Sequence, residues 1–121
     1  MRTDELYLTD IVEAVDAIMR FTVDAPEEQF LWDELVQAAV LQKLIVIGEA
    51  ASRISASIKA SYPDIPWSDI TGFRNIAVHA YFSVDWSIVW TTVTQDAPAL
   101  RAQIIEILAA QSPSGKGIST S

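Results

Sequence analysis

The chain has 121 residues, a length typical of one domain, and half of them are hydrophobic, which supplies one core and excludes a disordered chain. It has no cysteine and a single histidine, so disulfides, cysteine nucleophiles, thiolate zinc sites and multi-histidine metal sites within one chain are excluded. The formal net charge of −8 argues against general binding of nucleic acids, because phosphate contacts need lysine and arginine.

This charge is unevenly distributed along the chain. Residues 1–42 hold 10 acidic and 2 basic residues, whereas residues 43–81 hold 3 acidic and 4 basic ones. Residues 82–121 are close to neutral, with 3 acidic and 2 basic residues. The middle third is therefore the only part that does not repel a polyanion, and the acids of the first third are typical of a solvated helix face.

The spacing of the apolar residues predicts helices almost throughout. A first helix begins at a cap provided by Asp4 and ends near Phe21, because its apolar residues recur at intervals of three and four. Residues 24–28 form a break whose proline and acidic residues suit the first turn of a new helix. A short helix over residues 30–32 follows.

A long helix is expected from about Asp33 to Ser57 or beyond. It is apolar on more than one face, so it must be buried on two sides. One side belongs to the domain core. The other is either a subunit interface, where Gly48 allows a partner helix to approach closely, or is buried within the same bundle. Glu49 and Arg53 are four residues apart and are expected to form an ion pair within this helix.

The second half of the chain continues the helical pattern. Two prolines in residues 62–66 predict a turn, and residues 67–81 predict a further helix. Ser83 or Asp85 can cap a last helix, which Pro98 should kink or split. The tryptophans at the start of that helix, Trp86 and Trp90, have the spacing of core residues rather than of base-stacking ones.

These elements predict an all-α, up-and-down helical bundle over residues 1–111, followed by a flexible tail over residues 112–121. The polar, acidic start of the sequence leads into no continuous apolar run. We therefore expect neither a signal peptide nor a membrane span, and the default location is the cytoplasm.

The segment that carries chemistry is Gly-Phe-Arg-Asn-Ile-Ala-Val-His-Ala-Tyr, residues 72–81. On a helix, Asn75 and His79 share a face, so that Asn75 can hold the imidazole in one orientation. Arg74 and His79 are five residues apart, about 140° around a regular helix. Either the arginine stem wraps round the helix, or a second subunit completes the cleft.

Arginine and histidine together suit cleavage of an RNA phosphodiester without a metal. His79 can move a proton near neutral pH, and Arg74 offers a fork of donors that matches a phosphate. One histidine cannot easily serve as both base and acid, whereas a dimer cleft would bring two. By spacing alone, a single histidine near a helix end with an asparagine one turn away also fits a purely structural role.

The pattern Arg74-Asn75-x-x-x-His79-x-Tyr81 resembles the Arg-x4-His-x-Tyr motif of the HEPN superfamily, and specifically of the HepT-type toxins. Further segments look like landmarks of that family in the same order, so that the resemblance extends over roughly residues 5–110. These segments are residues 7–11, 47–51, 62–67 and 84–90.

The resemblance implies a HEPN-like, homodimeric helical bundle that acts as an endoribonuclease without metal or other cofactor. Arg74 and His79 of both protomers would line an interfacial cleft as the catalytic pair, with Asn75 in support. The family also suggests, as an alternative to a simple ion pair within the helix, a role for Glu49 near the cleft or at the antitoxin surface. The partner would be an MntA-like nucleotidyltransferase antitoxin of a type VII toxin–antitoxin system. That antitoxin would transfer AMP from ATP to Tyr81, adding bulk and negative charge that exclude an RNA phosphate.

The net negative charge of the chain does not suit a protein that binds RNA of any sequence. It favours either a narrow substrate, such as one tRNA, or a site whose positive field is local. The acidic first third could also meet a basic patch on the antitoxin. Two other functions stay open at this point: a non-catalytic HEPN scaffold that binds a nucleotidyltransferase or a nucleotide, and a plain helical interaction domain.

Overall fold

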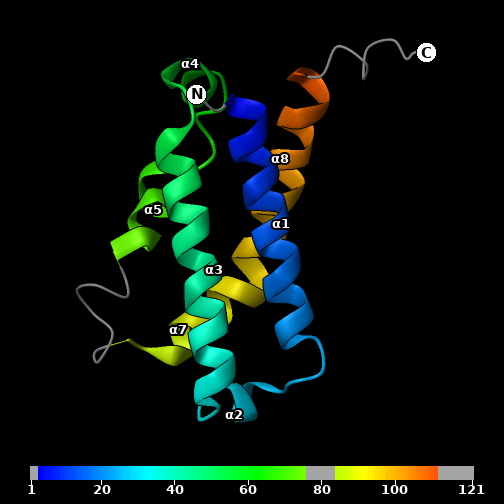
Figure 1. Cartoon of the computed structure of the whole chain (residues 1–121), viewed down its shortest axis with the longest axis vertical. Coiled ribbons are helices and arrows are strands. Elements are labelled where there is room, and N and C mark those ends of the chain that lie inside the picture. The colour runs from blue at the N-terminus through cyan, green and yellow to red at the C-terminus, as the bar shows by residue number, and fades with distance from the viewer. Residues whose placement is uncertain (1–2, 76–83, 112–121) are drawn as a thin grey trace.

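The computed structural model describes residues 3–75 and 84–111 (Figure 1). The described part contains helices and no strand, which confirms the predicted all-α fold. The helices are α1 (Asp4–Thr22), α2 (Glu27–Phe30), α3 (Glu34–Arg53), α4 (Ala56–Ser61), α5 (Trp67–Thr71), the 3₁₀ helix η1 (Gly72–Asn75), α7 (Trp86–Thr91), the π-helical turn η3 (Thr92–Asp96) and α8 (Ala97–Gln111). The tail predicted over residues 112–121 lies outside the described residues.

Helix α3 is the centre of the bundle. It contacts α1 along one side and α5 and η1 along the other, while α8 packs against α1. In Figure 1, α1 runs antiparallel to both α3 and α8. Both buried sides of α3 therefore find partners within this chain. The alternative in which Gly48 faces a partner subunit is wrong, because the backbone that approaches Gly48 belongs to α5 and η1.

By length and composition alone, α3 is apolar enough to cross a membrane. Its packing explains this composition, since a helix covered on two sides by its own chain needs apolar residues on both. The fully buried core draws on α1, α2, α3, η3 and α8. Its largest side chains are Leu8, Ile11, Val15, Ile18, Phe30, Val40, Leu44, Ile47, Val93, Ile104 and Ile107.

The long helix ends earlier than the apolar pattern predicts. It ends at Arg53 rather than at Ser57, because Ile54 has an extended backbone conformation with φ −72° and ψ 143°. Ser55 then caps the separate helix α4, with its Oγ accepting a hydrogen bond from the backbone nitrogen of Ile58 at 3.3 Å. A serine at an N-cap competes with continuation of the preceding helix, which explains the break.

The predicted cap of the first helix is also different. Thr3 occupies the N-cap position of α1, and Asp4 is the first helical residue. The Asp4 carboxylate instead accepts a hydrogen bond from the backbone nitrogen of Ser55 at 2.9 Å, 51 residues away in sequence. This bond ties the start of α1 to the break between α3 and α4.

The last helical region is divided where proline predicts it. Asp85 is the N-cap of α7, and its carboxylate accepts hydrogen bonds from the backbone nitrogens of Ser87 and Ile88 at 3.0 and 3.4 Å. Ser83, the other predicted cap, lies outside the described residues. The π-helical turn η3 separates α7 from α8 and places Pro98 in the first turn of α8. The helix continues through this turn without a break, and the N–H of Ala97 donates to the oxygen of Thr92, five residues back. Proline interrupts the regular i→i−4 bonding of an α-helix, and a π turn next to it is one way in which a helix accommodates that interruption.

Phe30 joins α2 to its two neighbours. Its buried ring lies 5.9 Å from the ring of Trp86 in an edge-to-face arrangement and 5.2 Å from the ring of Trp90. Both tryptophans are half-buried against the core, as their spacing predicts. The backbone oxygen of Phe30 accepts a hydrogen bond from Nε2 of the buried Gln37 at 2.9 Å. One residue thus holds α2 on α7 and on α3.

We predict that Phe30→Ala lowers the free energy of unfolding by about 3–5 kcal/mol, because a fully buried aromatic ring leaves a cavity between α2, α3 and α7. The measurement is urea denaturation followed by tryptophan fluorescence. Leu35→Ala is the matched control, since Leu35 is 81% exposed and its removal should change stability by no more than about 0.5 kcal/mol. Equal losses in the two variants would contradict the role given to Phe30.

Candidate functional site

The described structure contains half of the predicted motif. Arg74 and Asn75 are the last two residues of η1, and both are exposed. His79 and Tyr81 lie within residues 76–83, outside the described residues. The structure therefore gives the position of the predicted arginine, whereas its pairing with the histidine stays a prediction.

The helix predicted over residues 67–81 is not a continuous α-helix. The α-helical part α5 ends at Thr71, and Gly72–Asn75 form the 3₁₀ helix η1. Residues 72–75 wind at three residues per turn instead of 3.6, and His79 lies outside the described residues, so the angle of about 140° between Arg74 and His79 stays a prediction. The 3₁₀ helix η1 packs against α3.

Gly48 allows this approach. An ideal Cβ at Gly48 would lie 2.5 Å from the backbone nitrogen of Arg74 and 3.0 Å from the carbonyl oxygens of Ile70 and Thr71. Every atom in the way is backbone, so no side-chain rotation could relieve the overlap. Residue 48 must therefore lack a side chain if η1 is to lie where it does.

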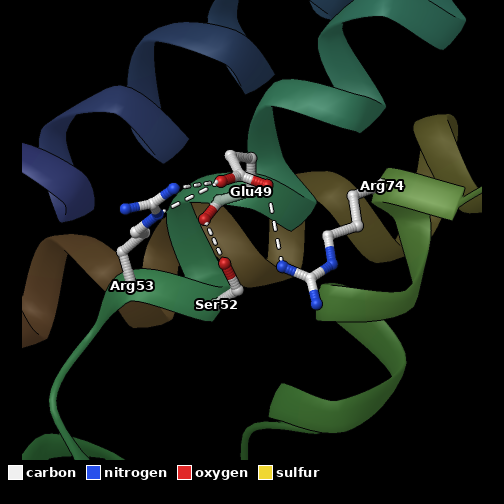
Figure 2. A network of polar contacts seen from close by, with 4 residues as sticks. All are labelled: Glu49, Ser52, Arg53 and Arg74. Carbon is white, nitrogen blue, oxygen red and sulfur yellow. Dashed lines mark hydrogen bonds and ion pairs between the residues drawn. The ribbon is translucent and has the colours of Figure 1, made fainter.

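The next residue of α3 contacts the Arg74 side chain. Oε1 of Glu49 lies 3.7 Å from Nη1 of Arg74, and the two side chains are 48% and 44% exposed (Figure 2). This is an ion pair beyond ordinary hydrogen-bonding distance. It gives the guanidinium a preferred direction while leaving much of it open to solvent.

The same carboxylate holds a second arginine. Nε and Nη2 of Arg53 donate to Oε2 of Glu49 at 3.1 and 2.9 Å, as the four-residue spacing predicts. Glu49 raises the pKa of Arg53 above its ordinary value, first through this hydrogen bond and then through its charge, and Tyr7 adds to the increase. Figure 2 shows Arg53 and Arg74 on opposite sides of the carboxylate.

The cluster Arg53–Glu49–Arg74 has a formal charge of +1 in a chain whose net charge is −8. Guanidinium groups are the donors that best match phosphate oxygens. In the part of the chain that the structure describes, no three carboxylate or histidine side chains are grouped in a way that could hold a metal ion. Among the described residues, the two arginines offer binding of an anion at this cluster.

The contact between Glu49 and Arg74 was not predicted from sequence spacing. Periodicity pairs Glu49 with Arg53 inside one helix, but it does not bring α3 to a residue 25 positions further along. A signal was present in Gly48, because the lack of a side chain allows another segment to approach closely. That neighbour is η1 rather than a second subunit.

Comparison with known proteins now gives the family. A family model described as "Ribonuclease HepT-like" matches residues 11–107. The chain belongs to the HepT-like ribonuclease family. The matched range contains Glu49, Arg53, Arg74 and the predicted catalytic His79. The resemblance drawn from the sequence motif is confirmed at the level of the family.

Similar proteins extend over nearly the same length. The chain is 40% identical over 102 residues to a "Probable ribonuclease HepT" of Thermococcus cleftensis, with 84% of this chain and 93% of the relative covered. It is 31% identical over 103 residues to "Putative RNase MJ1380" of Methanocaldococcus jannaschii, with 85% and 94% covered. No solved structure matches the chain. The named relatives support a nuclease role for this HepT-like chain.

We predict that Gly48→Ala destabilises the protein, because overpacking against backbone costs about 1–3 kcal/mol and outweighs the roughly 1 kcal/mol that alanine gains over glycine in a helix. Gly72→Ala is the matched control. A Cβ at Gly72 would have no neighbour within 4 Å, so this change should be neutral or stabilise by up to about 1 kcal/mol. Urea denaturation of both variants gives the comparison, and equal stability would refute the tight contact at Gly48.

Proposed function

We propose that this chain is the toxin of a type VII HepT/MntA-like toxin–antitoxin system and that it acts as a homodimeric, metal-independent endoribonuclease. Two observations together support this function: membership of the HepT-like ribonuclease family, and the motif Arg74-x4-His79-x-Tyr81. The exposed guanidinium of Arg74, anchored beside Glu49, fits a residue that must meet a substrate phosphate.

In this proposal, the reaction is attack of a ribose 2′-hydroxyl on the neighbouring phosphorus. His79 takes the proton of the hydroxyl, and the bond to the leaving 5′-oxygen breaks as that oxygen receives a proton. Arg74 stabilises the additional negative charge on the phosphorane. One histidine cannot easily remove a proton from the 2′-hydroxyl and also give one to the leaving 5′-oxygen. The second protomer of a dimer therefore supplies the imidazole that protonates the leaving oxygen.

Tyr81 is the proposed point of control, with Asn75 supporting the imidazole. Transfer of AMP from ATP to the Tyr81 hydroxyl by an MntA-like nucleotidyltransferase would place a phosphodiester and a nucleoside two residues from His79. Added negative charge and bulk would exclude the RNA strand. RNA, tRNA included, and ATP are present in the cytoplasm, so the cytoplasm is the proposed place of action.

We predict that the purified protein cleaves RNA in the presence of EDTA and that His79→Ala lowers the rate by about 10²–10⁴-fold, the usual contribution of a general acid–base residue. Arg74→Ala should lower it by about 10²–10³-fold, as removal of a donor to a transition-state charge does. The measurement is single-turnover cleavage of a labelled RNA.

Two results would contradict the catalytic assignment. Equal cleavage by the wild type and by His79→Ala would indicate a contaminating nuclease. Absence of cleavage in both, with RNA of every class supplied, would favour the non-catalytic scaffold. Growth arrest on expression, relieved by a neighbouring nucleotidyltransferase gene, would separate a toxin from a plain interaction domain.

We predict that incubation with the nucleotidyltransferase and ATP adds adenylate to Tyr81 and abolishes RNA cleavage. Mass spectrometry of the digested protein locates the modification. Tyr81→Phe keeps the ring and removes the acceptor oxygen, so this variant should stay unmodified and resist inhibition by the antitoxin. Adenylate found on another residue while Tyr81 is unmodified would refute this assignment.

A further inference from the structure

Arg53 is a second exposed cation beside Arg74, and the proposed reaction does not use it. It lies at the C-terminal end of α3, and its side chain is 59% exposed. Its Nη2 lies 2.9 Å from one oxygen of Glu49, and Nη1 of Arg74 lies 3.7 Å from the other. Since the two oxygens of a carboxylate are about 2.2 Å apart, these nitrogens are separated by no more than about 9 Å.

Arg53 has donors beyond those that Glu49 uses. Two of the five N–H donors of its guanidinium, one on Nε and one on Nη2, are directed at Glu49. Figure 2 shows its remaining terminal nitrogen on the side away from the carboxylate. Its guanidinium is charged at any working pH, as in every arginine. The side chain of Tyr7 hydrogen-bonds Arg53 as well. Because a guanidinium has five N–H donors, Arg53 can hold Glu49 and Tyr7 and still have donors left for a second anion.

Glu49 orients the two arginine side chains without neutralising both of their charges. One carboxylate between two guanidinium groups leaves a charge of +1, and the exposure of all three side chains keeps the ion pairs weak enough to be displaced in part by a stronger anion. Long arginine side chains lose rotamer entropy when they bind, and prior contact with Glu49 reduces that loss. The cluster is thus prepared for two negative charges a short distance apart.

We propose that Arg53 is a phosphate-binding residue that takes the RNA phosphate next to the scissile one, which Arg74 binds. This inference rests on the RNA-cleaving function proposed above. A single strand of RNA carries one negative charge per nucleotide. Two guanidinium groups whose nitrogens are no more than about 9 Å apart can therefore contact neighbouring phosphates of the same strand. Arg53 acts through binding, and its loss should raise KM more than it lowers kcat.

The test uses a 2′-O-methyl RNA strand with one unmodified ribose, which fixes the scissile phosphate because only that sugar has a nucleophile. In two further substrates, the phosphate on the 5′ or the 3′ side of the scissile one is replaced by a neutral methylphosphonate. For the wild type, one of these replacements should raise KM by roughly tenfold, as expected for loss of a charge-assisted hydrogen bond.

Arg53→Ala should raise KM for the fully charged substrate by roughly tenfold and should show no additional effect of that methylphosphonate. Arg53→Lys should recover part of the loss, since the charge returns without the fork. Arg20→Ala is the matched control, because it removes one exposed cation far from the cluster. Arg20 lies in the last turn of α1, roughly 20 Å along that helix from Tyr7, the residue of α1 that interacts with Arg53. This variant should retain the full methylphosphonate effect.

Two outcomes overturn the assignment. A methylphosphonate effect that persists unchanged in Arg53→Ala shows that the neighbouring phosphate is bound elsewhere. A lowered melting temperature with equal losses on all substrates shows that Arg53 is only structural.

Failure of the proposed ribonuclease is separable. If the wild type cleaves none of the substrates, that function fails, and the same comparison is made with dissociation constants from fluorescence anisotropy. Loss of the methylphosphonate effect in Arg53→Ala then supports the phosphate-binding role, and its persistence overturns it. Absence of binding by the wild type overturns both.

Discussion

The contact between α3 and the backbone of α5 and η1 is the constraint on which the candidate site depends. Because residue 48 is glycine, the nitrogen of Arg74 can lie only 2.5 Å from the position that a Cβ would otherwise occupy. The following residue, Glu49, then reaches the Arg74 side chain. Two adjacent residues of one helix thus set both the depth of η1 and the direction of its arginine, which couples packing to electrostatics.

The overall acidity of the chain is compatible with RNA chemistry because the relevant field is local. The first third of the sequence carries most of the excess acid, whereas Arg53 and Arg74 outnumber the single carboxylate between them. Solvent and salt screen distant surface charges within about 10 Å. Two acids of that first third lie near the cluster, since Asp4 accepts a hydrogen bond from the backbone of Ser55 and Asp10 lines the same pocket as Glu49 and Arg53. A phosphate would therefore have to bind directly at the two guanidinium groups, and the surrounding acids would discourage unspecific attachment of nucleic acid.

Sequence reasoning succeeded at most places where a local rule decides the structure, although it missed the N-cap at Ser55 that follows the early end of α3. The apolar pattern predicted the all-α bundle and the two-sided burial of α3, and Asp85 and Pro98 marked the start and the division of the last helical region. It failed where tertiary contact decides. The carboxylate of Asp4 serves Ser55 rather than its own helix, and η1 winds as a 3₁₀ helix against Gly48. Spacing along one helix cannot show which distant segment will lie beside it.

Helices α1 and α8, which are far apart in the sequence, pack against each other. Arg101 of α8 donates to Asp16 of α1 at 2.6 Å, across 85 positions of sequence, and the two helices pack along their lengths. A ribosome releases α1 before α8, so α1 emerges well before the helix that covers it exists. The bundle can close only when α8 has been synthesised. A nascent chain therefore remains unfinished in its tertiary structure, and any activity that needs the closed bundle begins only after α8 has left the ribosome.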